Sequence, residues 1–196
     1  MKEDQPSVRE RLLAAADELF YNEGVHTVGI DRVIEQAGVS KASLYAHFGS
    51  KDELIRAYLE GRHEARRRRI EQAFARYDTP RERLLAVFDV LADRLSRPES
   101  RGCAFIRAGA ESPIGSATER ATQEYRAWVV ELFTDQAQAA GAADPEALAA
   151  QLILLYDGAA VGTRMDGPST APAAARQAAE LLVDAATKRS RRPRAK

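Results

Sequence analysis

The chain has 196 residues, with 29 Lys and Arg against 29 Asp and Glu, three His and one Cys. This length is enough for one domain, or for a small domain fused to a larger one, to bury a core without crosslinks. A single cysteine excludes a disulfide framework or a cysteine-rich zinc site within the chain, and it is typical of a reducing cytosol.

The sequence predicts neither secretion nor membrane insertion. Its first residues include acids where a signal peptide needs an apolar run. The richest apolar stretch, Ala147 to Tyr156, is interrupted by Gln151 and followed by Asp157, so it falls short of the roughly 18 apolar residues of a membrane span. We therefore expect a cytoplasmic protein with no membrane partner.

The balanced net charge hides an uneven distribution. Residues 1–36 hold four basic and eight acidic residues, whereas residues 37–51 contain no acid and residues 188–196 contain six basic residues and no acid. These two acid-free windows could face a polyanion. For the basic tail at 189–196 we expect disorder, with non-specific attraction to DNA as the alternative.

The apolar residues repeat with helical spacing along the whole chain, and no run alternates as a strand would. A first helix is expected between Pro6-Ser7 and Gly24, where glycine can take the left-handed position that ends helices. Two short helices follow, one ended by Gly38 and one capped by Ser40. The segment Ser50 to Glu53 has the pattern of a capping box and opens a long helix toward residue 74.

Turn residues mark further helices in the second part of the chain. The expected spans are 80 to about 95, 103 to 110, 117 to about 140, 145 to about 164, and 172 to about 187. Residues 137–186 contain 18 alanines, which favours closely packed helices. The predicted fold class is all-α, with about nine helices.

The two short helices joined by Gly38-Val39-Ser40 have the pattern of a helix-turn-helix. In that motif the second helix enters the major groove of DNA while the first braces it. Burial of Leu44 and Phe48 turns the small residues Ala42 and Ala46 outward, so that the helix can approach base edges closely.

The flanking side chains have suitable chemistry for DNA. Lys41 can donate to a guanine edge and Ser43 can bond several bases, while alanine methyl groups can touch a thymine methyl. Tyr45, His47 and Lys51 are better placed for phosphates, which fix the register of a protein without reading the sequence.

The residues Leu19-Phe20, Gly24, Gly29-Ile30-Asp31 and the run AGVSKASLYAHFGSKDEL (Ala37 to Leu54) resemble the DNA-binding domain of the tetracycline-repressor (TetR) family of bacterial regulators. The resemblance covers about residues 8–60. The segments from Arg101 to Pro113 and from Leu154 to Gly162 are similar to one branch of that family.

The resemblance implies a helix-turn-helix domain at 1–51 and a larger helical ligand-binding and dimerisation domain at 52–188. It implies a homodimer that binds a palindromic operator in double-stranded DNA and responds to a small, mostly apolar effector. Repression is the expected mode of regulation, and activation is the alternative. The long helix from Asp52 toward Tyr77 spans both parts and is the natural coupling element. No catalytic residue, metal or cofactor is expected.

Two positions depart from the family pattern. The family usually has Ser or Thr where this chain has Gly29, and Thr27 is a candidate to compensate for the missing hydroxyl. Ala46 replaces a residue that is often larger. The expected DNA-binding residues are Thr27, Gly29, Ser40, Lys41, Ala42, Ser43, Tyr45, Ala46, His47 and Lys51.

Residues of the second part are assigned to the effector pocket or to the dimer interface. The expected pocket residues are Phe74, Phe88, Leu91, Phe105, Ile106, Tyr125, Trp128 and Asp157; the expected dimer residues are Leu152, Leu155, Tyr156, Ala159 and Leu181. For the aromatic and aliphatic residues the alternative is an ordinary core, and for Asp157-Gly158 it is a helix irregularity or a close helix crossing. Cys103 is expected to be a small buried hydrophobe, and the run Arg66 to Arg69 a solvated face.

Two other classes of protein compete with a regulator. An enzyme would need a catalytic or nucleotide-binding motif, and the chain has isolated histidines and no phosphate loop or dinucleotide fingerprint. A structural helical adaptor would keep the same periodicity, but it has no reason for a capped recognition segment free of acids. Salt-sensitive retention on DNA separates a regulator from an adaptor.

Overall fold

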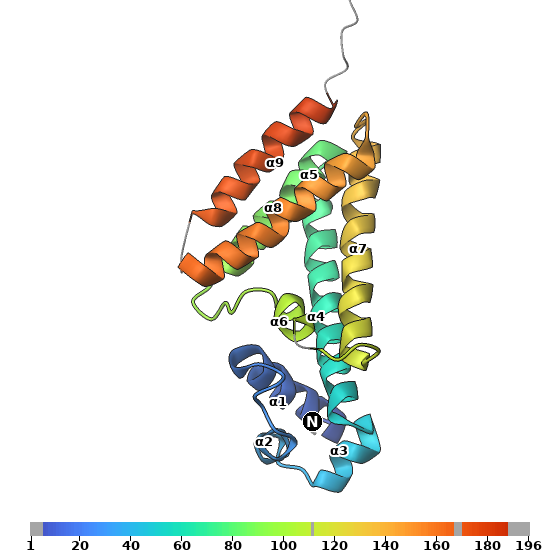
Figure 1. The fold of residues 1–196 in the computed structure, drawn as a ribbon, viewed down its shortest axis with the longest axis vertical. Coiled ribbons are helices and arrows are strands. Elements are labelled where there is room, and N and C mark those ends of the chain that lie inside the picture. The colour runs from blue at the N-terminus through green and yellow to red at the C-terminus, as the bar shows by residue number, and fades with distance from the viewer. Residues whose placement is uncertain (1–5, 111, 167–169, 188–196) are drawn as a thin grey trace, which may run out of the picture. The chain divides into compact units, whose positions relative to one another are not determined.

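The computed structural model describes residues 6–110, 112–166 and 170–187, and within these ranges the chain forms nine α-helices and no strand (Figure 1). The all-α prediction is therefore confirmed. The helices are α1 (Val8–Glu23), α2 (Ile30–Ala37), α3 (Lys41–Phe48), α4 (Lys51–Phe74), α5 (Pro80–Leu95), α6 (Ala104–Gly109), α7 (Ala117–Ala139), α8 (Pro145–Asp166) and α9 (Ala171–Thr187).

The ends of the first helices follow from their capping residues. The Ser7 hydroxyl accepts from the Glu10 backbone N–H, and the Glu10 carboxylate accepts from the Ser7 N–H, which makes a complete capping box for α1. Gly24 ends α1 with φ 101° and ψ 145°; the positive φ expected of glycine there is present, but ψ lies outside the left-handed helical region. Gly38 ends α2 with φ 63° and ψ 43°, which is the left-handed conformation that glycine adopts without strain.

The described chain separates into two compact units. The first comprises residues up to 66 together with 103–126, and the second comprises 67–102 together with the residues from 127 onward. Helices α4 and α7 each begin in the first unit and end in the second. These bounds describe packing; the division into functional domains at residue 51 stays a prediction.

In the first unit, α1, α2 and α3 pack against one another around a shared apolar core. Leu12, Val33 and Leu44, one from each helix, have no exposed surface. Phe20 of α1 meets Tyr58 of α4 edge to face, with ring centroids 5.7 Å apart. The apolar stripes predicted from helical spacing are therefore the faces that form this core.

The start of α4 is bonded to the start of α7 within the same unit. The Asp52 carboxylate accepts hydrogen bonds from the Ala117 N–H (2.6 Å), the Thr118 N–H (3.1 Å) and the Thr118 hydroxyl (2.5 Å). Partial burial alone would raise the pKa of the Asp52 carboxyl, but these hydrogen bonds outweigh it and lower the pKa below the ordinary value. Asp52 thus satisfies two N–H groups that the first turn of α7 leaves without helical acceptors.

The run of four arginines at 66–69 was predicted to be a solvated face, and this prediction is wrong for Arg66. Arg66 is buried; its guanidinium donates to the Tyr125 hydroxyl and lies 5.6 Å from the centre of the Phe105 ring. Phe105 and Tyr125 stack with centroids 3.7 Å apart. A guanidinium can enter an apolar core here because it has a hydroxyl acceptor and two aromatic faces.

The second unit contains α5, α8 and α9, which all pack against one another. Its centre is an aromatic cluster in which the rings of Phe88, Phe133 and Tyr156 lie 5.9–6.3 Å apart at steep angles. Gly162 of α8 marks a close approach to α9, because a Cβ atom there would lie 3.1 Å from the Ala171 Cβ. The alanine-rich sequence is consistent with this close packing.

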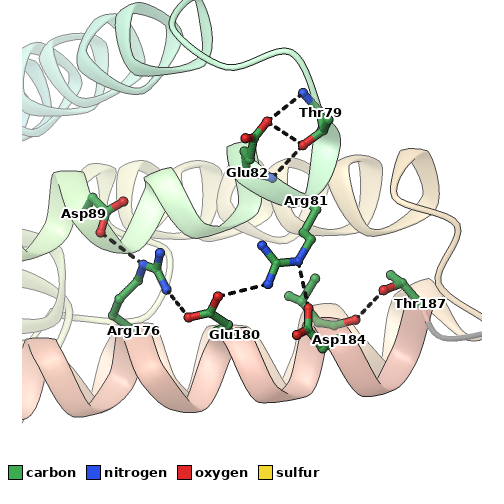
Figure 2. Close-up of polar contacts among 9 residues, drawn as sticks. Thr79, Arg81, Glu82, Asp89, Arg176, Glu180, Asp184 and Thr187 are labelled. Carbon is green, nitrogen blue, oxygen red and sulfur yellow. Dashed lines mark hydrogen bonds and ion pairs between the residues drawn. The ribbon is translucent and has the colours of Figure 1, made fainter.

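Charged side chains attach α9 to α5 on one side of α9 (Figure 2). Arg81 of α5 donates to Asp184 (2.7 Å) and Glu180 (2.9 Å), and Arg176 of α9 bonds both Glu180 (3.0 Å) and Asp89 of α5 (3.1 Å). The hydrogen bonds that Arg81 donates to Asp184 and Glu180 raise the pKa of its guanidinium, and the hydrogen bonds that Glu180 accepts from Arg81 and Arg176 lower the pKa of the Glu180 carboxyl. We call these five side chains the α5–α9 ladder.

Two further predictions concern the basic tail and the membrane. The basic tail predicted at 189–196 lies outside the described residues. Across the described ranges, none of the helices combines the length and the apolar composition needed to cross a membrane.

Candidate nucleic-acid interface

The recognition helix α3 is defined by its cap and by two buried side chains. The Ser40 hydroxyl accepts from the Ser43 N–H (3.1 Å) and lies 2.9 Å from the Ser43 hydroxyl. Leu44 has no exposed surface and Phe48 is buried. The helix is therefore fixed at its start by a cap and along one side by the core.

The opposite side of α3 is exposed and carries no acid. Ser43 is half-buried, and the exposed residues are Lys41, Ala42, Tyr45, Ala46 and His47. Tyr45 keeps 44 % of its surface accessible, which is unusual for an aromatic residue so close to a core. The predicted orientation of the helix is thus confirmed, while the DNA contacts of these residues stay predictions.

The turn between α2 and α3 is held by a residue that sequence reasoning missed. One guanidinium nitrogen of Arg11, from α1, lies 3.3 Å from both the Ala37 and the Gly38 carbonyl oxygens. These carbonyls end α2, where helices leave acceptors unsatisfied. No local signal in the sequence relates Arg11 to a turn 26 residues later; only the packing of α1 on the motif brings them together.

The start of α2 lacks a side-chain cap. Gly29 is the N-cap residue with φ −79° and ψ 158°, and it makes no side-chain hydrogen bond. A Cβ atom at Gly29 would meet nothing within 4 Å. Thr27 is exposed two residues earlier. The site therefore has room for the Ser or Thr that the family usually has, and compensation by Thr27 remains a prediction.

Lys51 is the first residue of α4, directly after the recognition helix. The Ser50 hydroxyl accepts from the Glu53 N–H (3.1 Å), which gives half of the predicted capping box, while the Glu53 carboxylate accepts from Arg56 (2.7 Å). Partial burial lowers the pKa of the Lys51 ammonium. A cation at a helix N-terminus is placed for an anion, since the exposed N–H groups attract the same ligand.

Lys41 forms an ion pair across the motif. Its ammonium lies 3.0 Å from the Asp31 carboxylate of α2, with 57 % and 81 % of the two side chains exposed. The hydrogen bond that Lys41 donates to Asp31, and then the negative charge of Asp31, raise the pKa of the Lys41 ammonium. The contact cannot be predicted from the spacing of the two residues, because it depends on the geometry of the turn, which brings the first turns of α2 and α3 together.

The expected effector-pocket residues fall in both compact units. In the first, Phe105 and Tyr125 are the buried stack described above, and Ile106 is 41 % exposed and lines a groove of about 400 Å³ with residues of the α1–α2 connection. In the second, Phe88 and Leu91 are buried, and the half-buried residues are Phe74, Trp128 and Asp157. Helix α8 continues unbroken through Asp157-Gly158, so the helix irregularity considered there is absent. Cys103 is buried, as expected.

The expected dimer residues divide by burial. Leu152, Tyr156 and Ala159 lie in the core of their own subunit and Leu155 is half-buried, whereas Leu181 is 72 % exposed. The large apolar residues that α8 does expose are Leu154 (72 %), Val161 (42 %) and Met165 (79 %). Three of the five predicted residues are therefore buried within this chain, because two apolar faces on one helix cannot be told apart from spacing alone.

A short capped helix with an exposed, acid-free face, braced by a second helix across a glycine turn, defines a helix-turn-helix DNA-binding protein. Comparison with family models gives the same class. Residues 12–58 match the model for bacterial regulatory proteins of the tetR family, and residues 80–179 match that for the tetracyclin repressor-like C-terminal domain. The chain belongs to the TetR family.

Known relatives are transcriptional regulators and not enzymes. SCO4454, a TetR-family regulator from Streptomyces coelicolor, is 32 % identical, with 92 % of this chain and 96 % of that chain covered and a TM-score of 0.87. The transcriptional activator FasR of Mycolicibacterium smegmatis is 37 % identical over 98 residues, which are 50 % of this chain and 44 % of that protein. The regulator LmrA of Bacillus subtilis is 26 % identical, over 74 % of this chain and 79 % of its own length. The match thus spans less than half of the length of FasR.

Proposed function

We propose that the protein is a homodimeric transcriptional repressor in the cytoplasm, which binds a palindromic operator and responds to a small, mostly apolar effector. The observation that carries this proposal is the exposed, acid-free face of α3 in a chain of the TetR family. Bound at a promoter, such a dimer would block transcription by occupying the site of the polymerase.

The recognition helix supplies two kinds of contact in this proposal. Lys41, Ala42 and Ser43 approach base edges in the major groove, where each base pair presents a distinct pattern of donors and acceptors. Tyr45, His47 and Lys51 bind phosphates and fix the register. The two α3 helices of a dimer would then lie about one turn of DNA apart, roughly 34 Å.

A second copy of the chain is the partner that the α8 and α9 surface fits. Every exposed residue of α8 from 147 to 161 is uncharged, and so is every exposed residue of α9. The large apolar side chains of this surface are Leu154, Val161 and Leu181, while Met165 lies further along α8 between the exposed Arg164 and Asp166. Large exposed apolar residues without charges among them are typical of subunit interfaces. We name this surface the α8–α9 face.

The effector would act by favouring a conformation whose recognition helices are wrongly spaced. To release DNA it must bind that conformation more tightly than the DNA-binding one, since equal affinity shifts nothing. Helix α4 begins in the DNA-binding unit and ends in the second unit, so it is the element through which we expect this shift to pass. Structures with and without effector in which α4 does not move would contradict this part of the proposal.

Fluorescence anisotropy tests the proposal directly. Purified protein is titrated onto labelled DNA from upstream of its own gene and onto a scrambled duplex, at several salt concentrations. We expect tighter binding to the upstream DNA, saturating at two chains per site. If genome-fragment selection also yields no DNA bound better than the scrambled duplex, the protein is not an operator-binding regulator.

Two substitutions separate the roles of the exposed residues. Tyr45→Ala should weaken binding to all sequences by the same factor, whereas Lys41→Ala should change the preference among bases. Equal losses on every duplex for both variants would overturn this division of labour.

Activation is the second candidate, because one relative carries the name of a transcriptional activator. The two candidates differ in the effect of deleting the gene. Transcripts next to the bound operator rise when a repressor is lost and fall when an activator is lost.

A further inference from the structure

The pair formed by Asp31 and Lys41 lies at the start of the two helices of the motif. Lys41 is the first residue of α3 and Asp31 the second residue of α2, and their charged atoms are 3.0 Å apart. Both side chains are more than half exposed. Asp31 therefore places a carboxylate beside the proposed base-reading residue, on a surface that is otherwise suited to a polyanion.

The ion pair between Asp31 and Lys41 adds little to the stability of the fold. An exposed ion pair contributes little to folding because water screens both charges and because two long side chains must be held in place. Toward DNA, however, a nearby carboxylate matters, since phosphates repel it and it competes with them for the same ammonium.

Pairing with Asp31 changes both the long-range attraction of Lys41 to DNA and its selectivity among bases at contact. At a distance the two charges cancel, so Lys41 adds little to the attraction that every DNA sequence exerts on a free cation. At contact, an ammonium that gives one of its three donors to Asp31 keeps two for the O6 and N7 atoms of a guanine edge.

We infer that Asp31 is a specificity-determining positioning residue, which holds Lys41 toward base edges and withholds it from non-specific phosphate contact. The inference rests on the proposed function, since it names how that same interface rejects other DNA. Rejection of wrong partners by a built-in unfavourable charge is a general route to specificity.

The test compares Asp31→Asn with a matched control. Glu35→Gln removes one exposed negative charge from the same helix, at a residue one turn along α2 from Asp31. We expect Asp31→Asn to bind scrambled DNA several-fold more tightly and the selected operator with a smaller gain, so that the specificity ratio falls. The dependence of log K on log salt should steepen by about one unit, as for one added phosphate contact. Glu35→Gln should leave the specificity ratio unchanged.

A double-mutant cycle with Lys41→Ala shows whether Asp31 acts through Lys41. In the Lys41→Ala background, Asp31→Asn should no longer change the specificity ratio. The inference is overturned if Asp31→Asn lowers the ratio as much without Lys41 as with it, or if Glu35→Gln has the same effect as Asp31→Asn. An Asp31→Asn protein with unchanged affinity for both duplexes overturns it as well.

The outcome for the wild-type protein keeps this inference distinct from the proposed function. A wild type with no preference between selected and scrambled DNA contradicts the function itself. A wild type with a clear preference that Asp31→Asn leaves intact contradicts the role of Asp31 alone. Circular dichroism on each variant checks that the protein keeps its helical content. This control is needed because an acid in the first turn also stabilises a helix through its interaction with the helix dipole.

Discussion

Helices α3 and α8 differ in the kind of residue that they expose to solvent. Helix α3 buries its aliphatic residue Leu44 and exposes mostly small and polar ones, whereas α8 exposes Leu154 and Val161 and buries other apolar residues behind them. A small, polar surface suits hydrated, charged DNA, and a large, uncharged apolar surface suits another protein. The comparison shows that exposure identifies an interaction surface only together with the chemistry of what is exposed.

The largest expected effect follows from placing a charge on the α8–α9 face. Leu181→Lys puts an ammonium where the partner subunit would exclude water, which costs far more than the contact it replaces. We expect a shift from dimer to monomer in light scattering. Operator affinity should fall by about two orders of magnitude or more, because the second half-site contact is no longer intramolecular.

A matched variant tells a lost interface from an altered net charge. Gln138→Lys adds the same charge on an exposed residue of α7, outside the face. It should remain dimeric and bind the operator like the wild type. A dimeric Leu181→Lys protein would mean that the apolar surface of α8 and α9 serves another partner.

A substitution in the core beneath the α8–α9 face should lower the stability of the protein without changing its DNA specificity. Phe133 has no exposed surface and its ring contacts Phe88 and Tyr156. Phe133→Ala should lower the free energy of unfolding by about 3–5 kcal/mol, because it removes buried apolar area and leaves a cavity. Urea unfolding followed by circular dichroism measures this. A loss below about 1 kcal/mol would show that this cluster is not the core of the second unit.

In the first unit, loss of the hydrogen bonds of Asp52 should lower stability less than Phe133→Ala does, and the loss should depend on pH. Asp52→Ala should cost about 1–2 kcal/mol at neutral pH, as loss of a helix cap does, while Asp52→Asn keeps an acceptor and should cost less. The pKa of Asp52 is lowered in the folded protein. Its contribution is therefore present above the ordinary aspartate pKa of about 4 and is lost as the pH falls through the lowered value.

Unfolding titrations from pH 7 to pH 2 check the sign of this dependence. The difference in stability between wild type and Asp52→Ala should shrink on acidification. A difference that stays constant over this range would show that the carboxylate charge has no part in capping α7.

The smallest expected effect concerns the uncapped start of α2. Gly29→Ser adds a hydroxyl in open space at an N-cap, which should raise stability by only a few tenths of a kcal/mol. Its effect on DNA should be larger than on folding, since the hydroxyl can donate to a phosphate. Gly29→Ala is the control without a hydroxyl. Equal operator affinity of the two variants would exclude a phosphate contact at this position.

Sequence reasoning was most accurate where a single residue determines local structure. Ser7, Ser40 and Gly38 fix helix ends through hydrogen bonds or backbone conformation that involve only neighbours within a few residues. The start and end of each short helix could therefore be predicted, and so could the outward face of α3.

It failed where a side chain depends on residues distant in the chain. The buried position of Arg66 depends on Tyr125, which is 59 residues away, and the ion pair of Lys41 depends on the turn that brings α2 near. Leu152, Tyr156 and Ala159 were expected on a surface and are buried, because α8 has apolar residues on more than one side and only its neighbours decide which side is covered.

The separation of charges on α9 has a consequence for how the protein responds to ionic strength. Its carboxylates and Arg176 all take part in the α5–α9 ladder (Figure 2), so the residues exposed on its outer side are uncharged. Added salt screens phosphate contacts strongly but does not weaken apolar association. A subunit joined through this surface would leave DNA at high salt as an intact pair, ready to rebind both half-sites at once when the salt falls.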